Sequence, residues 1–299
     1  SGLKFPEGPV AMDDGSVILV EIARGTLTRV DADGTVDVVA DCGGGPNGAA
    51  VGPDGAMYVC NNGGCFEWHD FGGLTIPGPL PRSWKGGSIQ RVDLDTGDVV
   101  TLYAECEGRQ LRAPNDLVFD AHGGFWFTDH GVRAERSSDR TGVFYAQADG
   151  SAITEVIFPL DAPNGVGLSP DGNRIYVAET HTGRLWAWDV TAPGVAASDP
   201  GAINAGGELL CGLPDMQLLD SLAVDAAGNV CVGTLVNGGI TIVSPDGSSY
   251  EHVPMPDMMI TNLCFGGPDL TTAYVTMSGT GQLGRGPWSG PGLALAHTA

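Results

Sequence analysis

A short pattern recurs six times along this chain: a residue with a side-chain oxygen opens an apolar run, and a turn follows. In five copies a glycine stands eight residues after the opening residue, and in the sixth copy the turn reads Gly267-Pro268-Asp269. Repeats of this spacing, each holding several short strands, are typical of β-propellers. The six opening residues, called the anchors below, are Glu7, Asn47, Asn115, Asn164, Asp220 and Asn262.

The repeat predicts an all-β fold, a six-bladed β-propeller with four-stranded antiparallel blades around a central channel. Apolar runs such as residues 17–20 and 57–60 have strand length and are rich in β-branched or aromatic side chains. Because each blade buries its faces only against its neighbours, we expect a single domain over residues 1–299. The last repeat ends in a turn-rich stretch over residues 286–292, so how the sixth blade closes is left open.

The anchors are predicted to meet, because each opens the same strand of its blade at one end of the channel. A ring of carboxylates and amide carbonyls is the ligand set of a hard divalent cation. Glu7 and Asp220 are the strongest candidates, since unpaired carboxylates buried in a channel are costly. Asparagine at a strand start also serves plain turn chemistry. That alternative stays open for Asn47 and Asn262.

Composition limits the partners and the setting. The net charge is −22, and such a surface repels phosphate backbones, so we expect no nucleic-acid partner. The seven cysteines form no CxxC pair or Cys/His cluster, which favours reduced thiols and a cytoplasmic protein. No signal-peptide or membrane-spanning pattern is present, unless a leader has been lost. We expect a monomer or a small homo-oligomer that does not bind membranes.

Residues 62–86 form a long insertion in the second repeat, after its second strand. Strands one and two are antiparallel, so the insertion should start on the face that carries the anchors. Loops of this length are often lids or binding elements. The aromatic residues of the insertion therefore either cover a pocket mouth or tuck onto their own blade.

Several motifs together resemble a known family. FPEGP (5–9), APNDL (113–117), APNGVGLSPDG (162–172), the Asp220 repeat and TNLCFGGPDLTTAYVT (261–276) are similar to the senescence marker protein/gluconolactonase/luciferin-regenerating-enzyme family. The resemblance covers nearly the whole chain. It implies one divalent metal in the channel and hydrolysis of lactones or related esters. It maps the metal ligands to Glu7, Asn164 and Asp220, with Asn115 as a fourth ligand or a neighbour through water.

On this basis we predict a divalent-metal-dependent lactonase. Oxygen ligands favour Ca²⁺, with Mg²⁺, Mn²⁺, Fe²⁺ and Zn²⁺ as alternatives. The metal would activate water and polarise the lactone carbonyl, with Asp220 as ligand and base. Asn115 and Asn47 are candidate substrate-binding residues.

Two further candidates lie near the anchors in sequence. His130 ends a strand on the anchor face, where it would shuttle a proton or bind a substrate oxygen, unless it is a surface loop histidine. Arg112 would hold a substrate carboxylate or carbonyl, although a rim arginine is an equal alternative. His181 occupies the analogous position in the fourth repeat.

Other functions remain as alternatives at this point. Hydrolysis of phosphotriesters, such as organophosphates, or of aryl esters would use the same metal site. A non-catalytic propeller scaffold is also compatible with the fold, but the repeats lack the regular Trp-Asp endings of interaction propellers, with Trp188-Asp189 as a lone pair. The chain carries no Gly-x-Ser-x-Gly motif and no P-loop, which disfavours a serine hydrolase and a nucleotide-binding enzyme.

Overall fold

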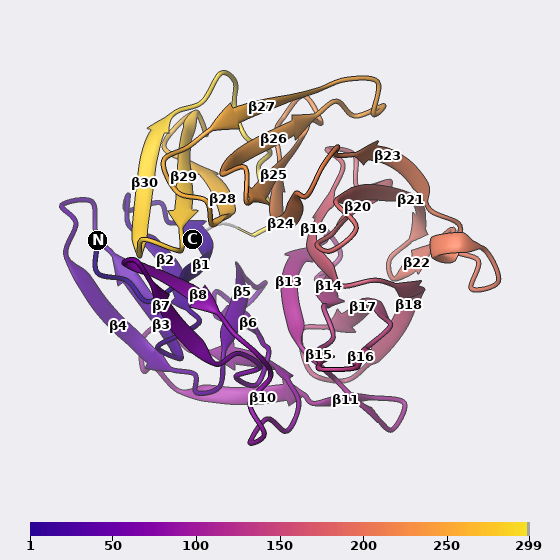
Figure 1. Ribbon diagram of the computed structural model, residues 1–299, viewed down its shortest axis with the longest axis horizontal. Helices are drawn as coiled ribbons and strands as arrows, with labels where there is room; N and C mark the ends of the chain where they lie inside the picture. Colours follow the sequence, from indigo (N-terminus) through magenta and orange to yellow (C-terminus); the bar gives the residue numbers. More distant parts are fainter. Residues whose placement is uncertain (298–299) are drawn as a thin grey trace.

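The computed structural model describes residues 1–297 and shows six antiparallel sheets arranged in a ring (Figure 1), which confirms the predicted six-bladed propeller. The strands of the first three blades are β1 (Pro6–Ala11), β2 (Val17–Glu21), β3 (Thr26–Val30) and β4 (Val36–Asp41); β5 (Pro46–Val51), β6 (Met57–Asn61), β9 (Ser88–Val92) and β10 (Val99–Tyr103); and β13 (Pro114–Phe119), β14 (Gly124–Asp129), β17 (Thr141–Gln147) and β18 (Ile153–Leu160).

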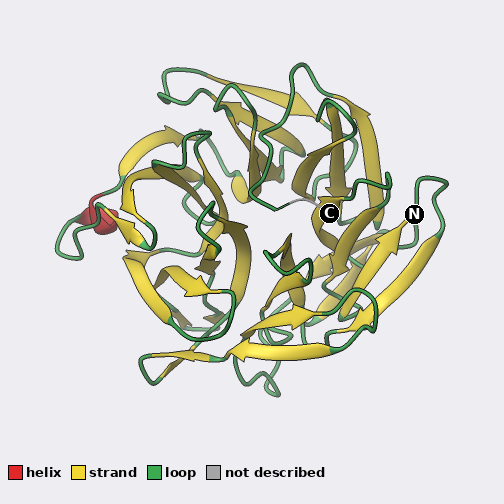
Figure 2. Cartoon of the chain, turned by 180° about the vertical axis from the view of Figure 1, so that it is seen from behind, coloured by secondary structure: helices red, strands yellow, loops and turns green. Residues whose placement is uncertain are grey.

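The other three blades complete the ring. Their strands are β19 (Pro163–Leu168), β20 (Arg174–Glu179), β21 (Arg184–Ala192) and β23 (Glu208–Gly212), with β22 (Val195–Ala196) also paired to β21; β24 (Leu218–Val224), β25 (Val230–Leu235), β26 (Gly239–Val243) and β27 (Tyr250–Pro254); and β28 (Ile260–Gly266), β29 (Thr272–Met277) and β30 (Gln282–Pro287). A short 3-10 segment, η1 (Ile203–Gly206), lies on the outer rim before β23 (Figure 2). No helix of the described residues is long and apolar enough to cross a membrane.

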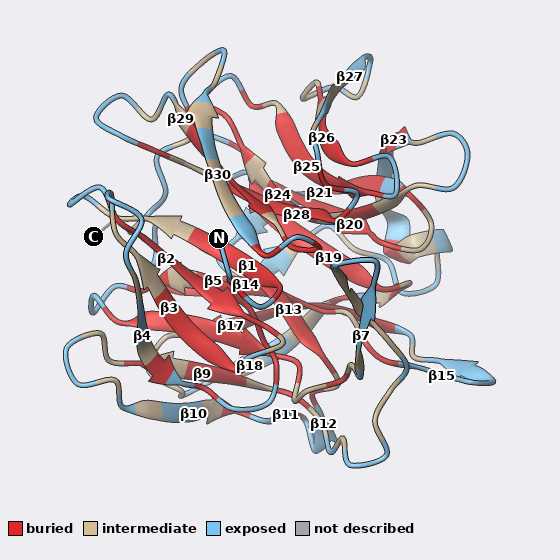
Figure 3. Ribbon diagram, turned by 60° about the vertical axis from the view of Figure 1, so that its left-hand side comes forward, coloured by how far each residue is buried: buried red, intermediate tan, exposed pale blue. Residues whose placement is uncertain are grey.

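Hydrophobic contacts between neighbouring blades form the core. The inner and middle strands are buried, whereas outer strands such as β4, β10 and β27 are largely open to solvent (Figure 3). Between the second and third blades, Tyr58 of β6 packs edge-on against Phe119 of β13, with ring centroids 5.0 Å apart. Tyr58, Phe125 and Phe127 are at most 1% exposed. Each blade therefore covers the apolar face of the next, as expected for a repeat fold.

The prediction of four strands in every blade is wrong for the sixth blade, which has three strands over residues 1–297. After β30 the chain turns back towards the fifth blade, where Leu293 N–H donates to the Val224 carbonyl at 3.0 Å. Gly and Pro dominate residues 286–292, and proline has no N–H to extend a sheet. The ring closes where the sixth blade meets the N-terminal segment: Leu3 N–H donates to the Gly281 carbonyl at 3.1 Å, and Ser278 Oγ donates to the Pro6 carbonyl at 2.5 Å.

Three hairpins project from the ring. They are β7 (Trp68–Phe71) with β8 (Leu74–Pro77) in the insertion, β11 (Glu105–Cys106) with β12 (Arg109–Gln110), and β15 (Arg133–Ala134) with β16 (Ser137–Ser138). In Figure 3, β7 and β15 project on the same side of the ring. The β15–β16 hairpin, residues 131–140 with its flanks, is called the arm below.

Candidate functional site

A backbone irregularity marks every anchor. In each of the six blades, the pairing of the innermost strand with its neighbour shifts register beside the anchor residue. Such a bulge lets two residues of one strand oppose a single residue of its partner, which redirects their side chains. In four blades proline precedes the anchor, as with Pro114 and Pro163, and a first-position proline is compatible with a strand. The bulges therefore give the anchors the same orientation in each blade.

The inner strands approach so closely that glycine is required between them. A Cβ on Gly48 would lie 2.5 Å from the Asn115 carbonyl oxygen of the next blade, and one on Gly165 would lie 2.7 Å from that of Asp220. Gly8 also has a positive φ of 50°, and its Cβ would lie 2.7 Å from the Ala49 nitrogen. These contacts bring chain-distant anchors together at one end of the channel, as predicted.

Glu7 is the most enclosed acid of this ring, at 1% exposure. Its Oε2 accepts hydrogen bonds from Asn262 Nδ2 at 2.7 Å and from the Gly8 N–H, whereas its Oε1 has no hydrogen-bond partner. Burial raises the pKa of Glu7 to about 7, although these hydrogen bonds oppose the shift. A buried carboxylate oxygen without a partner is a position where a cation is expected.

The anchor amides present oxygen atoms to the same ring. Asn115 is 5% exposed, and its Oδ1 has no hydrogen-bond partner. Asn164 donates from Nδ2 to Thr180 Oγ1 at 3.0 Å, which fixes the amide orientation. Its Oδ1 accepts from Ser221 Oγ of the next blade at 3.3 Å and retains a second lone pair. Both side chains can thus act as neutral oxygen ligands.

Asp220 completes the predicted set and is partly open to solvent. Burial first, and then the negative charge of Glu7, raise the pKa of Asp220 well above its usual value, and Asp116 adds to the effect. Glu7 and Asp116 are therefore close enough to Asp220 for their negative charges to repel that of its carboxylate. A divalent cation between them would remove that repulsion.

Asp116 is a ring residue that the sequence analysis missed. It is 6% exposed, and burial together with the charge of Glu7 raises its pKa well above the usual range. Its Oδ2 accepts the Val166 N–H of the next blade at 3.2 Å, so it links two inner strands. The sequence did contain a signal, because the position after the anchor is glycine in three other blades, at Gly8, Gly48 and Gly165.

This donor set fits a hard divalent cation. It combines carboxylate oxygens with amide oxygens, and two of the buried oxygens, Glu7 Oε1 and Asn115 Oδ1, lack partners. Across residues 1–297, no group of three His, Cys, Asp or Glu side chains is arranged to hold a metal by themselves. The ring is therefore a mixed carboxylate and amide site, with Glu7, Asn115, Asn164 and Asp220 as its candidate ligands.

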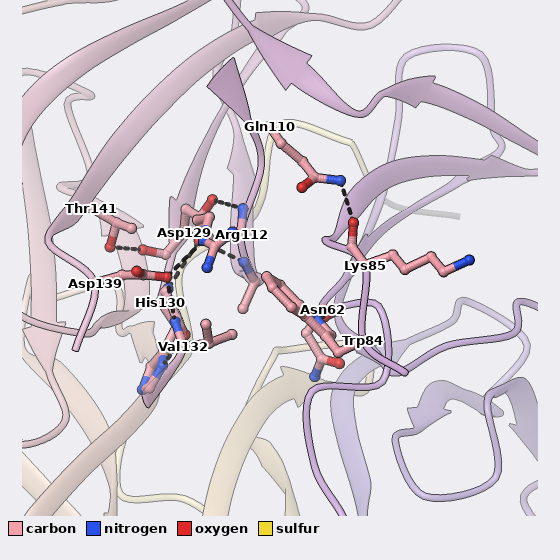
Figure 4. Close-up of polar contacts among 12 residues, drawn as sticks. Asn62, Trp84, Lys85, Gln110, Arg112, Asp129, His130, Val132, Asp139 and Thr141 are labelled. Carbon is pink, nitrogen blue, oxygen red and sulfur yellow. Dashed lines mark hydrogen bonds and ion pairs between the residues drawn. The ribbon is translucent and has the colours of Figure 1, made fainter. Parts of the chain in front are cut away.

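The remaining candidates lie at different depths. Asn47 is 7% exposed on β5, within the ring. Arg112 lies at the rim, where Nε donates to Asp139 Oδ2 at 2.7 Å and the guanidinium stacks on Trp84 at 4.5 Å from the ring centroid (Figure 4). Asp129 accepts the Arg112 and Ala113 N–H groups, each at 2.7 Å, and so fixes the strand that leads to Asn115.

His130 and His181 form a pair between the third and fourth blades. Their rings meet edge to face with centroids 5.4 Å apart. Burial lowers the pKa of His130, and burial with the neighbouring His130 lowers the pKa of His181 to about 4. His181 follows Thr180, the partner of Asn164 Nδ2. The pair is thus neutral at pH 7 and lies beside the ring on the anchor face.

The insertion crosses the anchor face instead of folding onto its own blade. Trp68 of β7 packs against Phe5 with ring centroids 4.9 Å apart and the ring planes tilted by 49°, and it joins an apolar cluster that includes Leu218. Phe5 and Leu218 each lie two residues before a carboxylate of the ring. At the far end, Thr75 N–H donates to the Gly279 carbonyl of the sixth blade at 2.8 Å.

The chain belongs to the SMP-30/Gluconolactonase/LRE-like family, whose family model matches residues 5–279. It is 26% identical over 294 residues to a gluconolactonase of Zymomonas mobilis, across 89% of this chain and 74% of that protein. It is 28% identical over 244 residues to the lactonase drp35 of Staphylococcus saprophyticus, across 81% and 67% of the two chains. The family assignment made from the motifs is therefore confirmed.

A solved structure shares the fold. The chain superposes on regucalcin of Agrobacterium tumefaciens, described as a calcium-binding protein, with a TM-score of 0.69 and 20% sequence identity. The match covers 92% of this chain and 83% of that one. Identity at this level establishes the common architecture.

Proposed function

We propose that this member of the SMP-30/gluconolactonase family is a divalent-metal-dependent lactonase. Two lines of support converge on this. The relatives named above are a gluconolactonase and a lactonase. The ring of Glu7, Asn115, Asn164 and Asp220 offers buried oxygens of which two have no protein partner. Those unpartnered oxygens carry the proposal, because a folded chain seldom buries such groups unless something else binds them.

Lactone hydrolysis requires a water oxygen to bond to the carbonyl carbon and the ring C–O bond to break, which yields a hydroxy acid. A bound divalent cation would polarise the carbonyl and increase the acidity of water. Asp220 is the candidate base, because it is partly open to solvent while Glu7 is enclosed.

The other residues position the substrate in this proposal. Asn47 and Asn115 would contact the lactone oxygens from within the ring, and neutral His130 would donate to or accept from a substrate hydroxyl. Arg112 contributes from the rim. Asp139 accepts the Nε hydrogen bond of Arg112, and Trp84 covers one face of its guanidinium group. The terminal nitrogens of Arg112 therefore remain as hydrogen-bond donors. Ca²⁺ is the expected ion, since all candidate ligands are oxygen atoms. The calcium-binding description of the regucalcin structure agrees with this choice.

The decisive experiment is a substrate panel with controlled metal. Aldonolactones, simple γ- and δ-lactones, aryl esters and a phosphotriester are assayed with chelator and after restoring Ca²⁺, Mg²⁺, Mn²⁺, Fe²⁺ or Zn²⁺. We expect lactone hydrolysis that chelator abolishes and Ca²⁺ restores. Undiminished hydrolysis in metal-free protein would contradict the metal-dependent mechanism, and turnover of the phosphotriester alone would contradict the substrate class.

A further inference from the structure

A cleft of about 620 Å³ lies between the insertion and the arm. Its walls include Leu80, Arg82 and Trp84 on one side and Arg133 and Glu135 on the other. This volume is in the range of small-molecule sites, about 300–1,000 Å³. The cleft therefore has room for part of a substrate, and none of the ring residues discussed above lines it.

The charges around the cleft are opposite in sign to those of the protein as a whole. Arg82 and Arg133 line the cleft against the single acid Glu135, and Lys85 and Arg136 are the next residues along the two wall segments. The whole chain has 14 Lys and Arg against 36 Asp and Glu. All four cationic residues are exposed. A local positive patch in a strongly acidic protein attracts anions to that point of the surface.

These cations remain available to a ligand. Within residues 1–297, Arg82, Lys85 and Arg136 form no salt bridge, and Arg133 forms one, from Nη2 to Asp161 Oδ1 at 3.4 Å. The side chains of that pair are 49% and 40% exposed. An exposed ion pair of this length is weak, so a ligand can replace it. Arg112 nearby uses its Nε to bind Asp139, which leaves only its terminal nitrogens as donors.

The cleft adjoins the anchor ring through continuous contacts. Leu80 and Trp84 pack on a small apolar cluster with Ala113 and Val132, and Ala113 lies two residues before Asn115. On the other side, the charge of Arg133 contributes to lowering the pKa of both His130 and His181. Arg133 is thus close enough to the two histidines for its charge to affect them.

We propose that this cleft binds an anionic group of the substrate, so that the preferred lactone carries a carboxylate besides its lactone carbonyl. The inference rests on the proposed lactonase function and names its substrate class. Arg82 and Arg133 supply charge and hydrogen-bond donors, and the Trp84 ring offers a flat apolar surface to the carbon chain. In this arrangement the lactone carbonyl lies at the ring, and the carboxylate reaches the arginines of the cleft.

The kinetic test compares an aldarolactone, which carries a free carboxylate, with the aldonolactone of the same ring size. The measured quantity is the ratio of their kcat/KM values. In the wild type we expect the carboxylated lactone to be preferred, with a preference that weakens as salt is added. Arg82→Gln and Arg133→Gln should each reduce the ratio by about 10- to 100-fold, the loss expected for a charge-assisted hydrogen bond.

Two control variants distinguish the loss of positive charge in the cleft from a general loss of structure. Arg82→Lys keeps the charge and should retain most of the preference. Arg29→Gln removes a partly exposed arginine that pairs with Asp14 in the first blade, where no effect on the ratio is expected. A ratio near one in the wild type, or a ratio that both glutamine variants leave unchanged, would overturn the proposal. Lactone hydrolysis would persist in that case, so the proposed function would stand.

A binding measurement tests the cleft without catalysis. Calorimetry of the purified protein, with and without chelator, compares an open-chain aldarate with the matching aldonate. We expect tighter binding of the dicarboxylate, lost in the Arg82→Gln/Arg133→Gln double variant. Equal binding of both acids would overturn the subsite. Arginine-dependent binding in a protein that hydrolyses no lactone would instead refute the proposed function and support an anion-binding site in the cleft.

Discussion

The anchor ring and the cleft lie on the same face of the propeller, but they are held in place in different ways. In the ring, backbones of neighbouring blades touch, so that even a methyl group on Gly48 or Gly165 would clash. Around the cleft, exposed loops meet through side chains, such as Trp84 under Arg112. The ring thus owes its geometry to the repeated backbone, whereas the cleft depends on individual side chains. We expect chemistry to reside in the ring and substrate selection at the cleft.

The largest expected effect is on catalysis. Asp220→Asn keeps an oxygen ligand of the same size but removes the charge and the capacity to accept a proton. We expect kcat to fall by about 10²–10⁴-fold with little change in KM. Asp246→Asn, an exposed turn residue of the same blade, is the matched control. Near wild-type turnover by Asp220→Asn with metal still bound would refute Asp220 as the base.

Metal binding should stabilise the ring as a unit. A cation that binds only the folded ring adds about 3–4 kcal/mol to the free energy of unfolding at 100 to 1,000 times its dissociation constant. Chelator should therefore lower the melting temperature while leaving a folded propeller, because the blades retain their core. Glu7→Gln should show a smaller response to Ca²⁺. A melting curve that does not move after demonstrated metal removal would contradict this role.

The close approach of the inner strands can be tested by adding one methyl group. In Gly48→Ala the new Cβ would meet the Asn115 carbonyl at 2.5 Å, so the blades must move apart. We expect a loss of about 1–3 kcal/mol in the free energy of unfolding, together with weaker Ca²⁺ binding. Gly286→Ala is the control, because no atom lies within 4 Å of its Cβ position. Equal denaturation midpoints for the two variants would show that the inner strands are not in tight contact.

The difference between a ring set by the repeated backbone and a cleft set by individual side chains also explains what the sequence could predict. Each anchor recurs at one position of its repeat, so all six were identified from their phase. The family resemblance then singled out Glu7, Asn164 and Asp220 as metal ligands. Asp116 was missed because strict alternation places consecutive side chains on opposite faces. The bulge between Pro114 and Leu117 breaks that alternation and leaves both Asn115 and Asp116 buried.

The contacts at the rim could not be predicted from the sequence repeat. Arg112 was recognised as a candidate, but its partners Trp84 and Asp139 come from two loops that follow no repeat. The three-stranded sixth blade had a partial signal in the Gly- and Pro-rich stretch after residue 286. Its closure through Ser278 and Pro6 depends on tertiary contacts between the two ends of the chain.

A smaller effect is expected from His181 and depends on pH. Its pKa in the folded protein is about 4, compared with an ordinary value of 6.5. Between these values the unfolded chain binds the extra proton, so stability is lost as the pH falls from about 6.5 towards 4. The melting temperature of His181→Gln should therefore fall less than that of the wild type as the pH is lowered over this interval. Substitution of the exposed His69 by Gln is the control. Identical pH profiles for His181→Gln and wild type would contradict a neutral, half-buried imidazole at position 181.

The smallest effect concerns the support of Arg112 by the insertion. Trp84→Leu removes the aromatic face under the guanidinium, and we expect KM to rise by about 2- to 5-fold at unchanged kcat, the size of an exposed cation–π contact. Phe71→Leu, an aromatic of the same insertion that is 73% exposed, should have no effect. The change also removes a wall of the cleft, so a double-mutant cycle is needed. If Trp84 acts by positioning Arg112, its effect disappears in an Arg112→Gln background, whereas an effect of full size there would show that Trp84 contacts the substrate directly.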